Sequence, residues 1–477
     1  MTEQESASLL RPQSFSVVAP AGHGKTEMIT ELVSHSCGRT LLLTHTNAGV
    51  DALEKRLRKR SVPSSLYRIA TIASFCGSWC KAYYRNANLD KSPSLYLSDN
   101  AEKDYERSYV GAKEIFSHAW AGVILRASYS AVIVDEYQDC TKSQHEMFLA
   151  ISKFLPVKIF GDPMQGIFSF GGNLVDWNSI EFENVPVKTS PWRWHETNPL
   201  LGEYLGVLRE QLSPCLYGHP CDIHIEPCNG SIEILPPDVD YYKLSNYLSG
   251  RYEKIVYLTR WPRQQLAFCQ KMRGRFQYDE KQDCDELFEY SRHFDEKIGA
   301  KLFLSVIEFA GKCATQVRVE LSSYIHRLEK GNLDFHRISK HPELGKLLTE
   351  CEKLDPNDSV GVLLEWFRSN DLFKKYRSEL LSEMIRSVRY ARSQGITLNE
   401  ASHCIRATPG LQRRYNQFQF LASRTLLSKG LEFDCVIIDM SSEKQQNRLS
   451  AKEFYVAMTR AMKRIFIIAP SSDLHLL

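Results

Sequence analysis

The segment Phe15-Ser-Val-Val-Ala-Pro-Ala-Gly-His-Gly-Lys-Thr26 determines the fold that we expect for this chain. It begins with an apolar run typical of a buried parallel strand, and a helical pattern follows it. A glycine-rich loop in this context predicts a phosphate-binding loop, because its backbone N–H groups can approach phosphate oxygens at the positive end of the helix. In such loops the lysine reaches the β- and γ-phosphates and the threonine binds Mg²⁺. The expected ATP ligands are Ala21, Gly22, His23, Gly24, Lys25 and Thr26.

A second motif, Val134-Asp-Glu-Tyr-Gln-Asp139, directly follows another apolar run. Ligands of open α/β sheets bind at the carboxyl ends of the strands. We therefore expect Asp135 to hold Mg²⁺ through water, and Glu136 to orient and deprotonate the attacking water in phosphoryl transfer. An acidic strand end alone is often only a solvated loop, but its combination with the phosphate loop favours the catalytic interpretation.

Apolar runs alternate with helical patterns in two parts of the chain. The first set of expected strands is 15–19, 40–44, 131–135 and 157–161. The second set is 254–259, 418–422, 435–439 and 464–469. This alternation predicts an α/β fold with two doubly wound parallel-sheet domains and helical insertions.

Domain boundaries are expected where these patterns change. The first α/β domain covers 1–205, with a short helical insertion at about 85–125. A proline-rich stretch at 214–237 is a candidate linker. The remaining expected units are a linker with the start of the second domain at 206–284, a helical insertion at 285–405, and the rest of the second domain at 406–477.

Composition excludes several classes of protein. Lys and Arg total 60 against 57 Asp and Glu in 477 residues, so nucleic-acid binding would need a local basic groove rather than a global positive field. Hydrophobic residues make up 43% and charged residues 25%, which argues against a disordered chain. We expect a cytoplasmic protein without membrane contact, because the sequence shows neither a signal peptide nor a membrane-spanning apolar run.

The 13 cysteines are irregularly spaced in a long chain, which favours free thiols in a reducing compartment. One local cluster contains Cys215, His219, Cys221, His224 and Cys228. Its spacings match no common zinc pattern, so a loop with free thiols is the favoured interpretation and metal binding stays open.

Together the motifs resemble those of superfamily 1 DNA helicases of the UvrD/Rep/PcrA type. The sequence Asp-Glu-Tyr-Gln-Asp in the second motif is similar to that family rather than to DEAD-box or DExH proteins. The resemblance covers about residues 4–205, 250–280 and 415–470, and it implies two RecA-like domains that bind ATP between them. The chain resembles a compact member of the family, because its first helical insertion is short.

The resemblance implies further nucleotide contacts. Gln165 would sense the γ-phosphate, and Arg193 and Arg460 would be arginine fingers that act when the two domains close. The other implied contacts are Gln4 and Trp192 at the adenine and Glu432 near the ribose.

The resemblance also implies a DNA-binding surface. Aromatic faces suit sequence-tolerant binding of single strands, although phenylalanine at this spacing is also common in a core. The implied DNA contacts are His45, Asn47, Phe75, Phe168 and Phe170. The chain departs from the family at Ala73 and Leu426, where the family has His, and at Gly171, where it has Arg.

Two functions fit these motifs. The first is a DNA-dependent ATPase that translocates on or unwinds DNA 3′-to-5′ with Mg-ATP, the direction coming from the resemblance alone. The second is a DNA-sensing regulatory ATPase that activates a partner nuclease in bacterial anti-phage defence, like the helicase-like subunit of Gabija-type systems. The short first insertion and the departures favour the second function, and the sequence contains no recognisable nuclease motif. A binding module without ATPase activity is disfavoured, because the catalytic residues are all present.

Overall fold

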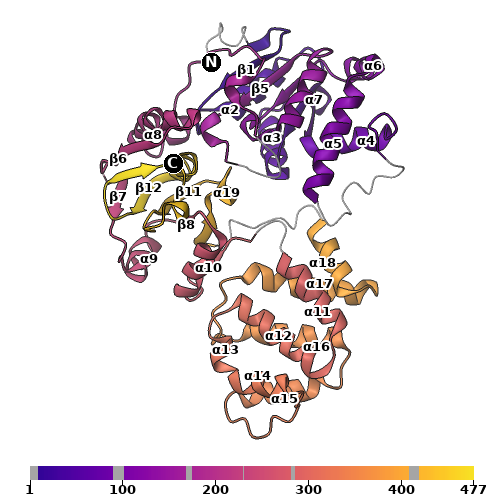
Figure 1. Ribbon diagram of the computed structural model, residues 1–477, viewed down its shortest axis with the longest axis vertical. Helices are drawn as coiled ribbons and strands as arrows, with labels where there is room; N and C mark the ends of the chain where they lie inside the picture. Colours follow the sequence, from indigo (N-terminus) through magenta and orange to yellow (C-terminus); the bar gives the residue numbers. More distant parts are fainter. Residues whose placement is uncertain (1–8, 90–100, 168–173, 229, 281–284, 408–417) are drawn as a thin grey trace.

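Two parallel sheets and a separate group of helices make up the computed structural model (Figure 1). The structure describes residues 9–89, 101–167, 174–228, 230–280, 285–407 and 418–477. The predicted fold class is confirmed, because every strand pair within the two large sheets is parallel and helices flank both sheets.

The first sheet has five strands in the order β1-β5-β4-β2-β3. Its strands are β1 (Phe15–Val18), β2 (Thr40–Thr44), β3 (Tyr67–Thr71), β4 (Ala131–Val134) and β5 (Val157–Gly161). The four strands expected here from apolar runs all form, but β3 was not predicted. This strand lies at the edge of the sheet and its residues after Tyr67 are exposed or half-buried, so it lacks the continuous apolar run of an inner strand.

Alternate residues of each inner strand face two different cores, which places helices on both sides of the first sheet. In β2, Leu41 and Leu43 face one core and Leu42 faces the other. The helices are α2 (Lys25–Ser34) and α3 (Asn47–Lys59) on one side, and α4 (Ile72–Ala82), α5 (Ala101–Phe116), α6 (Ala119–Ser128) and α7 (Lys142–Ser152) on the other. In the region expected as the first insertion, α5 packs against α4 and α7 and thickens this layer.

The second sheet has six strands in the order β7-β12-β11-β8-β10-β9. These strands are β7 (Ile232–Leu235), β8 (Ile255–Thr259), β9 (Gln277–Tyr278), β10 (Phe420–Arg424), β11 (Phe433–Asp439) and β12 (Ala461–Ile468). The helices of this domain are α8 (Pro199–Leu212), α9 (Tyr241–Ser249), α10 (Pro262–Lys271), α19 (Thr425–Ser428) and α20 (Ala451–Met458). The central strand β11 again separates two cores, with Val436 and Ile438 on one face and Cys435 and Ile437 on the other.

The stretch 214–237 is not the linker that its prolines suggest. It contains β6 (Cys221–His224), which pairs antiparallel with β13 (Asp473–Leu476), and it contains β7 of the second sheet. The prolines flank these short strands and do not interrupt them. The boundary expected at 205 falls inside α8, whose leucines pack into the core of the second domain together with Val256.

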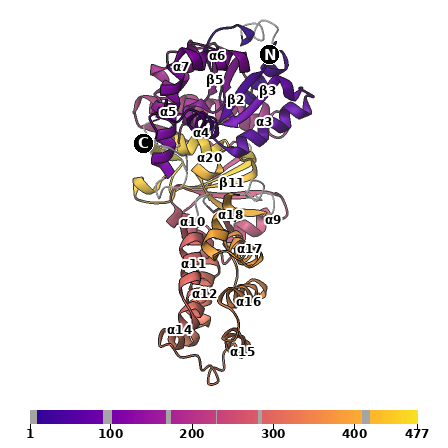
Figure 2. The same cartoon turned by 90° about the vertical axis from the view of Figure 1, so that its right-hand side faces the viewer.

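A helical unit is inserted between β9 and β10 and has its own apolar core. Figures 1 and 2 show it projecting away from both sheets. Its helices are α11 (Asp285–Glu296), α12 (Gly299–Cys313), α13 (Val317–Glu320), α14 (Ser322–Glu329), α15 (Pro342–Cys351), α16 (Pro356–Ser369), α17 (Ser378–Gln394) and α18 (Leu398–Ala407). Within the described ranges, no helix combines the length and apolar character needed to cross a membrane.

Candidate nucleotide site between the two sheets

The phosphate loop connects β1 to α2. Gly22 and Gly24 have φ of 71° and 84°, left-handed conformations that a side chain would strain. Helix α2 begins at Lys25, so the backbone N–H groups of its first turn lie next to the loop without helical acceptors. The Lys25 ammonium is buried and donates to the Ala19 carbonyl at 2.9 Å. The loop therefore has the backbone shape and the positive charge that a phosphate chain requires.

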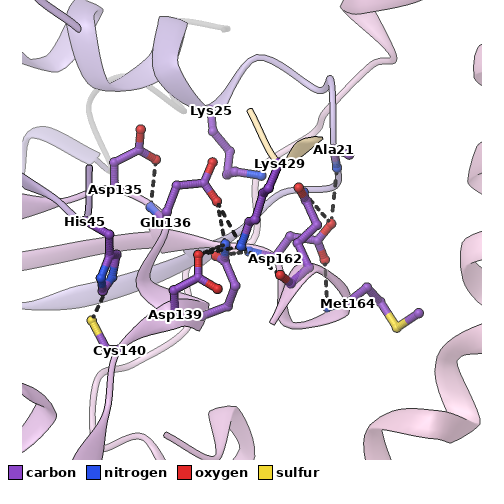
Figure 3. Close-up of polar contacts among 12 residues, drawn as sticks. Ala21, Lys25, His45, Asp135, Glu136, Asp139, Cys140, Asp162, Met164 and Lys429 are labelled. Atoms are coloured by element: carbon purple, nitrogen blue, oxygen red, sulfur yellow. Dashed lines mark hydrogen bonds and ion pairs between the residues drawn. The ribbon is translucent and has the colours of Figure 1, made fainter. Parts of the chain in front are cut away.

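Asp135 and Glu136 lie at the carboxyl end of β4, near Lys25 (Figure 3). Glu136 has a φ of 56°, and its N–H donates to Asp135 Oδ1 at 2.9 Å. Burial and the neighbouring Glu136 raise the pKa of Asp135 to about 7. Burial also opposes ionisation of Glu136, but Lys429 and Lys25 outweigh it and lower the pKa of Glu136 to about 2. One carboxylate is thus held ionised, and the other would gain from a nearby cation.

Gln138 connects the end of β4 to the end of β5. Its Nε2 donates to Glu136, and its Oε1 accepts a hydrogen bond from the Asp162 N–H at 2.9 Å. Gln165, in the turn that follows β5, is buried and donates from Nε2 to Asp162 Oδ2 at 3.2 Å. Because β4 and β5 are neighbours in a parallel sheet, their carboxyl ends bring these side chains together.

The second domain contributes a lysine to this network (Figure 3). Lys429, directly after α19, forms an ion pair with Asp139 and donates to the Gln165 carbonyl at 2.7 Å. Its Nζ lies 4.0 Å from Glu136 Oε2. Lys429 therefore supplies positive charge from one domain to the carboxylates of the other.

The two expected arginine fingers also lie at this interface. Arg460 is buried, and its Nη2 donates to Gln165 Oε1 at 3.5 Å. Burial and the nearby Arg193 lower the pKa of Arg460 to about 9. Burial and Arg193 thus disfavour the positive charge of Arg460, and an anion bound between the domains would stabilise that charge. Arg193 donates from its backbone N–H to the Gly22 carbonyl at 3.0 Å and pairs through Nη2 with Glu432 Oε1 at 2.9 Å.

Two further expected nucleotide contacts adjoin the phosphate loop. Trp192 precedes Arg193 and is 62% exposed, so its ring has a face available for a base. His23 Nδ1 lies 2.9 Å from Thr189 Oγ1. Burial and Lys25 lower the pKa of His23 to about 4, so this side chain adds no positive charge to the loop at neutral pH.

The expected DNA contacts occupy different environments. Asn47 is exposed at the start of α3, and His45 is half-buried with Nε2 3.6 Å from Cys140 Sγ. Phe75 is buried in the core, where its ring stacks on Phe116 at a centroid distance of 5.9 Å, and so presents no open face to a base. The expected contacts Gln4, Phe168 and Phe170, and the departure at Gly171, lie outside the described residues.

Two family models match the chain. One, described as an AAA domain, matches residues 3–171, and the other, described as a UvrD-like helicase C-terminal domain, matches residues 422–468. Residues 422–468 are thus similar to UvrD-like helicases, and residues 3–171 are similar to AAA domains. The two matches fall on the two sheets, on either side of the candidate nucleotide site.

Solved structures similar to this chain include two of the Arterivirus nonstructural protein 10 helicase, one of them in complex with DNA. Each is 11% identical with a TM-score of 0.35 and covers 98% of this chain. The chain spans only 62% and 61% of the length of those two chains. No curated protein matches it at a significant level.

The candidate nucleotide site offers oxygen ligands that suit Mg²⁺. The Thr26 hydroxyl is at the start of α2, and the Asp135 carboxylate is buried with a pKa raised by that burial, so a cation would compensate it. Elsewhere, over the part of the chain that the structure describes, no group of three or more His, Cys, Asp or Glu is arranged to hold a metal ion. In the cysteine cluster, Cys221 is buried in β6, and Cys215 Sγ lies 3.8 Å from Met164 Sδ.

Asp162, Lys429 and Trp194 are among the residues of the candidate nucleotide site that were not expected from the sequence to act there. Asp162 and Lys429 lie inside motif strings, but only the structure shows their contacts with other motifs. Trp194 is buried beside the phosphate loop and donates from Nε1 to the Ala461 carbonyl at 2.7 Å. The Trp-Arg-Trp repeat at 192–194 was the available signal for it.

Proposed function

We propose that this chain is a DNA-dependent ATPase that hydrolyses Mg-ATP between its two α/β domains and moves along DNA. The observation that supports this proposal is the meeting of two sets of groups across one interface. The first domain supplies the phosphate loop, Glu136 and Gln165, and the second supplies Lys429 and Arg460. Hydrolysis would need both domains, because phosphoryl transfer depends on positioning and charge neutralisation from both sides of the phosphate.

The first domain binds the nucleotide and activates water. The loop N–H groups and Lys25 hold the β- and γ-phosphates. Thr26 and Asp135 would hold Mg²⁺, which neutralises phosphate charge when it is bound. Glu136, kept ionised by Lys429 and Lys25, orients the attacking water and accepts its proton.

The second domain and the segment that leads into it act on charge that develops during the reaction. Arg193 and Arg460 lie beside the phosphate loop and Gln165, so their guanidinium groups stabilise the charge on the transferring phosphoryl group. The exposed ring of Trp192 stacks on the adenine. Closure of the two domains on ATP would then be coupled to the DNA that lies across them, with a 3′-to-5′ direction carried over from the family.

A regulatory role is the second candidate. It is favoured by the first insertion, in which α5 packs against α4 and α7. A long, protruding insertion could guide a duplex toward the two α/β domains, whereas the described part of this short insertion adds to the core layer instead. In this regulatory role, ATP hydrolysis in response to DNA binding would activate a partner nuclease, and unwinding would be weak.

The test compares ATP hydrolysis and nucleotide affinity in three variants. Lys25→Ala should abolish hydrolysis, because the loop loses its cation. Glu136→Gln should still bind ATP but lose roughly 100-fold or more in kcat, because binding and proton abstraction are separate roles. Lys346→Ala, an exposed lysine on α15, is the matched control. Turnover at the wild-type rate in Glu136→Gln would contradict the assigned base.

A further inference from the structure

The Asp162 carboxylate lies at the centre of the interface between the two α/β domains. It is fully buried, with 0% of the residue exposed, at the carboxyl end of β5. A buried carboxylate is costly unless a cation and hydrogen-bond donors compensate it. The partners of Asp162 therefore show what this charge holds in place.

The first domain provides three of these partners. Ala21 of the phosphate loop donates its backbone N–H to Oδ2 at 3.1 Å, and the amide of Gln165 donates to the same oxygen at 3.2 Å. The Met164 N–H donates to Oδ1 at 3.2 Å. Asp162 thus joins the phosphate loop to the residue expected to sense the γ-phosphate.

The second domain provides the cation. Arg209 Nη2 lies 3.0 Å from Asp162 Oδ1, and the Tyr455 hydroxyl on α20 donates to Oδ2 at 3.4 Å. Arg209 is in the last turn of α8, and its side chain is 14% exposed. Its position is fixed, because the leucines of α8 pack into the core of the second domain. The arginine also lies 3.6 Å from Glu210, but that carboxylate is 78% exposed and the contact is weak by comparison.

We infer that Arg209 is a positioning residue for ATP hydrolysis. By pairing with Asp162 when the two domains dock, it fixes the phosphate loop at Ala21 and the amide of Gln165 in one arrangement. The nucleotide site is then fully ordered only in the docked state. This inference rests on the proposed ATPase function and adds to it a specific link between domain docking and the catalytic geometry.

The inference predicts a larger effect on rate than on nucleotide binding. Lys25, Thr26 and the loop glycines still bind the phosphates when Arg209 is replaced. Gln165, Arg193 and Arg460 act on the transition state. Small displacements of such groups lower the catalytic rate strongly. We therefore expect Arg209→Met to lower kcat by roughly 10- to 100-fold while the dissociation constant for a fluorescent ATP analogue changes by about 3-fold or less.

Matched variants distinguish a loss of catalytic geometry from a loss of folding. Arg209→Lys keeps the charge and should recover a large part of the rate. Glu210→Gln removes only the exposed partner of Arg209 and should match the wild type. Asp162→Asn combined with Arg209→Met leaves no unpaired buried charge, so it should fold even where Arg209→Met does not. In the double-mutant cycle the effects on kcat should be far from additive.

The possible outcomes are distinct. A wild-type kcat in Arg209→Met, or additive effects of the two substitutions on kcat, would overturn the inference while leaving the proposed function intact. Absence of hydrolysis in both the wild type and Glu210→Gln, with DNA present, would instead contradict the proposed function. If Arg209→Met unfolds, the cycle is replaced by the comparison of Arg209→Lys with the double variant. An equal kcat in those two proteins would then overturn the inference.

Discussion

Gly22 shows at the scale of one residue how closely the phosphate loop fits the second domain. Its φ of 71° is a left-handed conformation, and a Cβ at this position would lie 2.7 Å from Cζ3 of Trp194 and 2.9 Å from Cβ of Arg193. Both neighbours belong to the segment that leads into the second domain. Glycine is therefore required for two reasons. The left-handed backbone conformation disfavours other residues, and a side chain here would collide with the buried ring of Trp194.

We expect Gly22→Ala to lower ATP affinity and hydrolysis by roughly 10-fold or more, because left-handed strain costs about 1–2 kcal/mol and the clash with Trp194 adds to it. Fluorescent-nucleotide titration and a steady-state ATPase assay measure both effects. Gly218→Ala is a matched control, since Gly218 has a φ of 79° but no atom within 4 Å of its Cβ position. If the two variants behave alike, the contact with Trp194 has no importance for the site.

At the scale of elements, the helical unit is anchored to the second domain by the segment before α17. The Tyr278 N–H donates to the Tyr376 carbonyl at 2.6 Å, and the Tyr376 ring is buried in the core of the second domain. The next residue, Arg377, pairs with Glu280 through two hydrogen bonds of 2.6 and 2.7 Å. Both side chains are almost completely buried, and Arg377 also pairs with Glu286 of α11. One arginine thus joins the second domain to the helical unit.

Arg377→Met should destabilise the protein by about 3–5 kcal/mol, because it leaves the Glu280 carboxylate buried without its cation. The double variant Arg377→Met with Glu280→Met should regain most of this loss, because two apolar side chains need no compensation. Urea denaturation gives both values. Arg392→Met breaks an ion pair whose arginine is 72% exposed and should cost about 1 kcal/mol or less. A double variant as unstable as the single one would show that packing, not charge, anchors the unit.

At the scale of the whole molecule, the protein consists of two sheets that meet at the candidate nucleotide site and a helical unit that projects away from both sheets (Figures 1 and 2). The formal charge of +3 is too small to attract DNA by a global field, so the proposed DNA binding would have to come from local contacts. Leu426, at the start of α19, stands where the family has a histidine, close in sequence to Lys429 at the interface. Under the proposed function, this departure favours the regulatory alternative, in which hydrolysis responds to DNA binding and strand separation is weak.

We expect single-stranded DNA to stimulate ATP hydrolysis, whereas the isolated chain should separate long duplexes poorly. Strand displacement on duplexes of increasing length, run beside an ATPase assay on the same DNA, tests this difference. Lys25→Ala serves as the control for hydrolysis-independent melting. Efficient separation of long duplexes by the chain alone would defeat the regulatory alternative and restore a conventional helicase.

Several features could be predicted from the sequence because they depend on neighbours along the chain. The apolar runs gave the inner strands of both sheets, and the strand–glycine loop–helix pattern gave the phosphate loop. Short-range patterns of this kind depend on the burial and backbone conformation of consecutive residues, so they can be identified without the tertiary structure. The same patterns failed for β3, which is half-exposed, and for β6 and β7, which are short and flanked by prolines.

The tertiary structure alone decided which groups meet. Arg209 pairs with Asp162 across 47 positions, and Lys429 reaches Asp139 across 290. Tertiary packing also determined that Phe75 is part of a core rather than a DNA contact, because burial depends on which helices cover a residue. Contacts between distant segments depend on how two cores dock, and no periodicity along the chain carries that information. The sequence therefore determined the chemical groups of the site, and the packing of the two domains determined the network that holds them together.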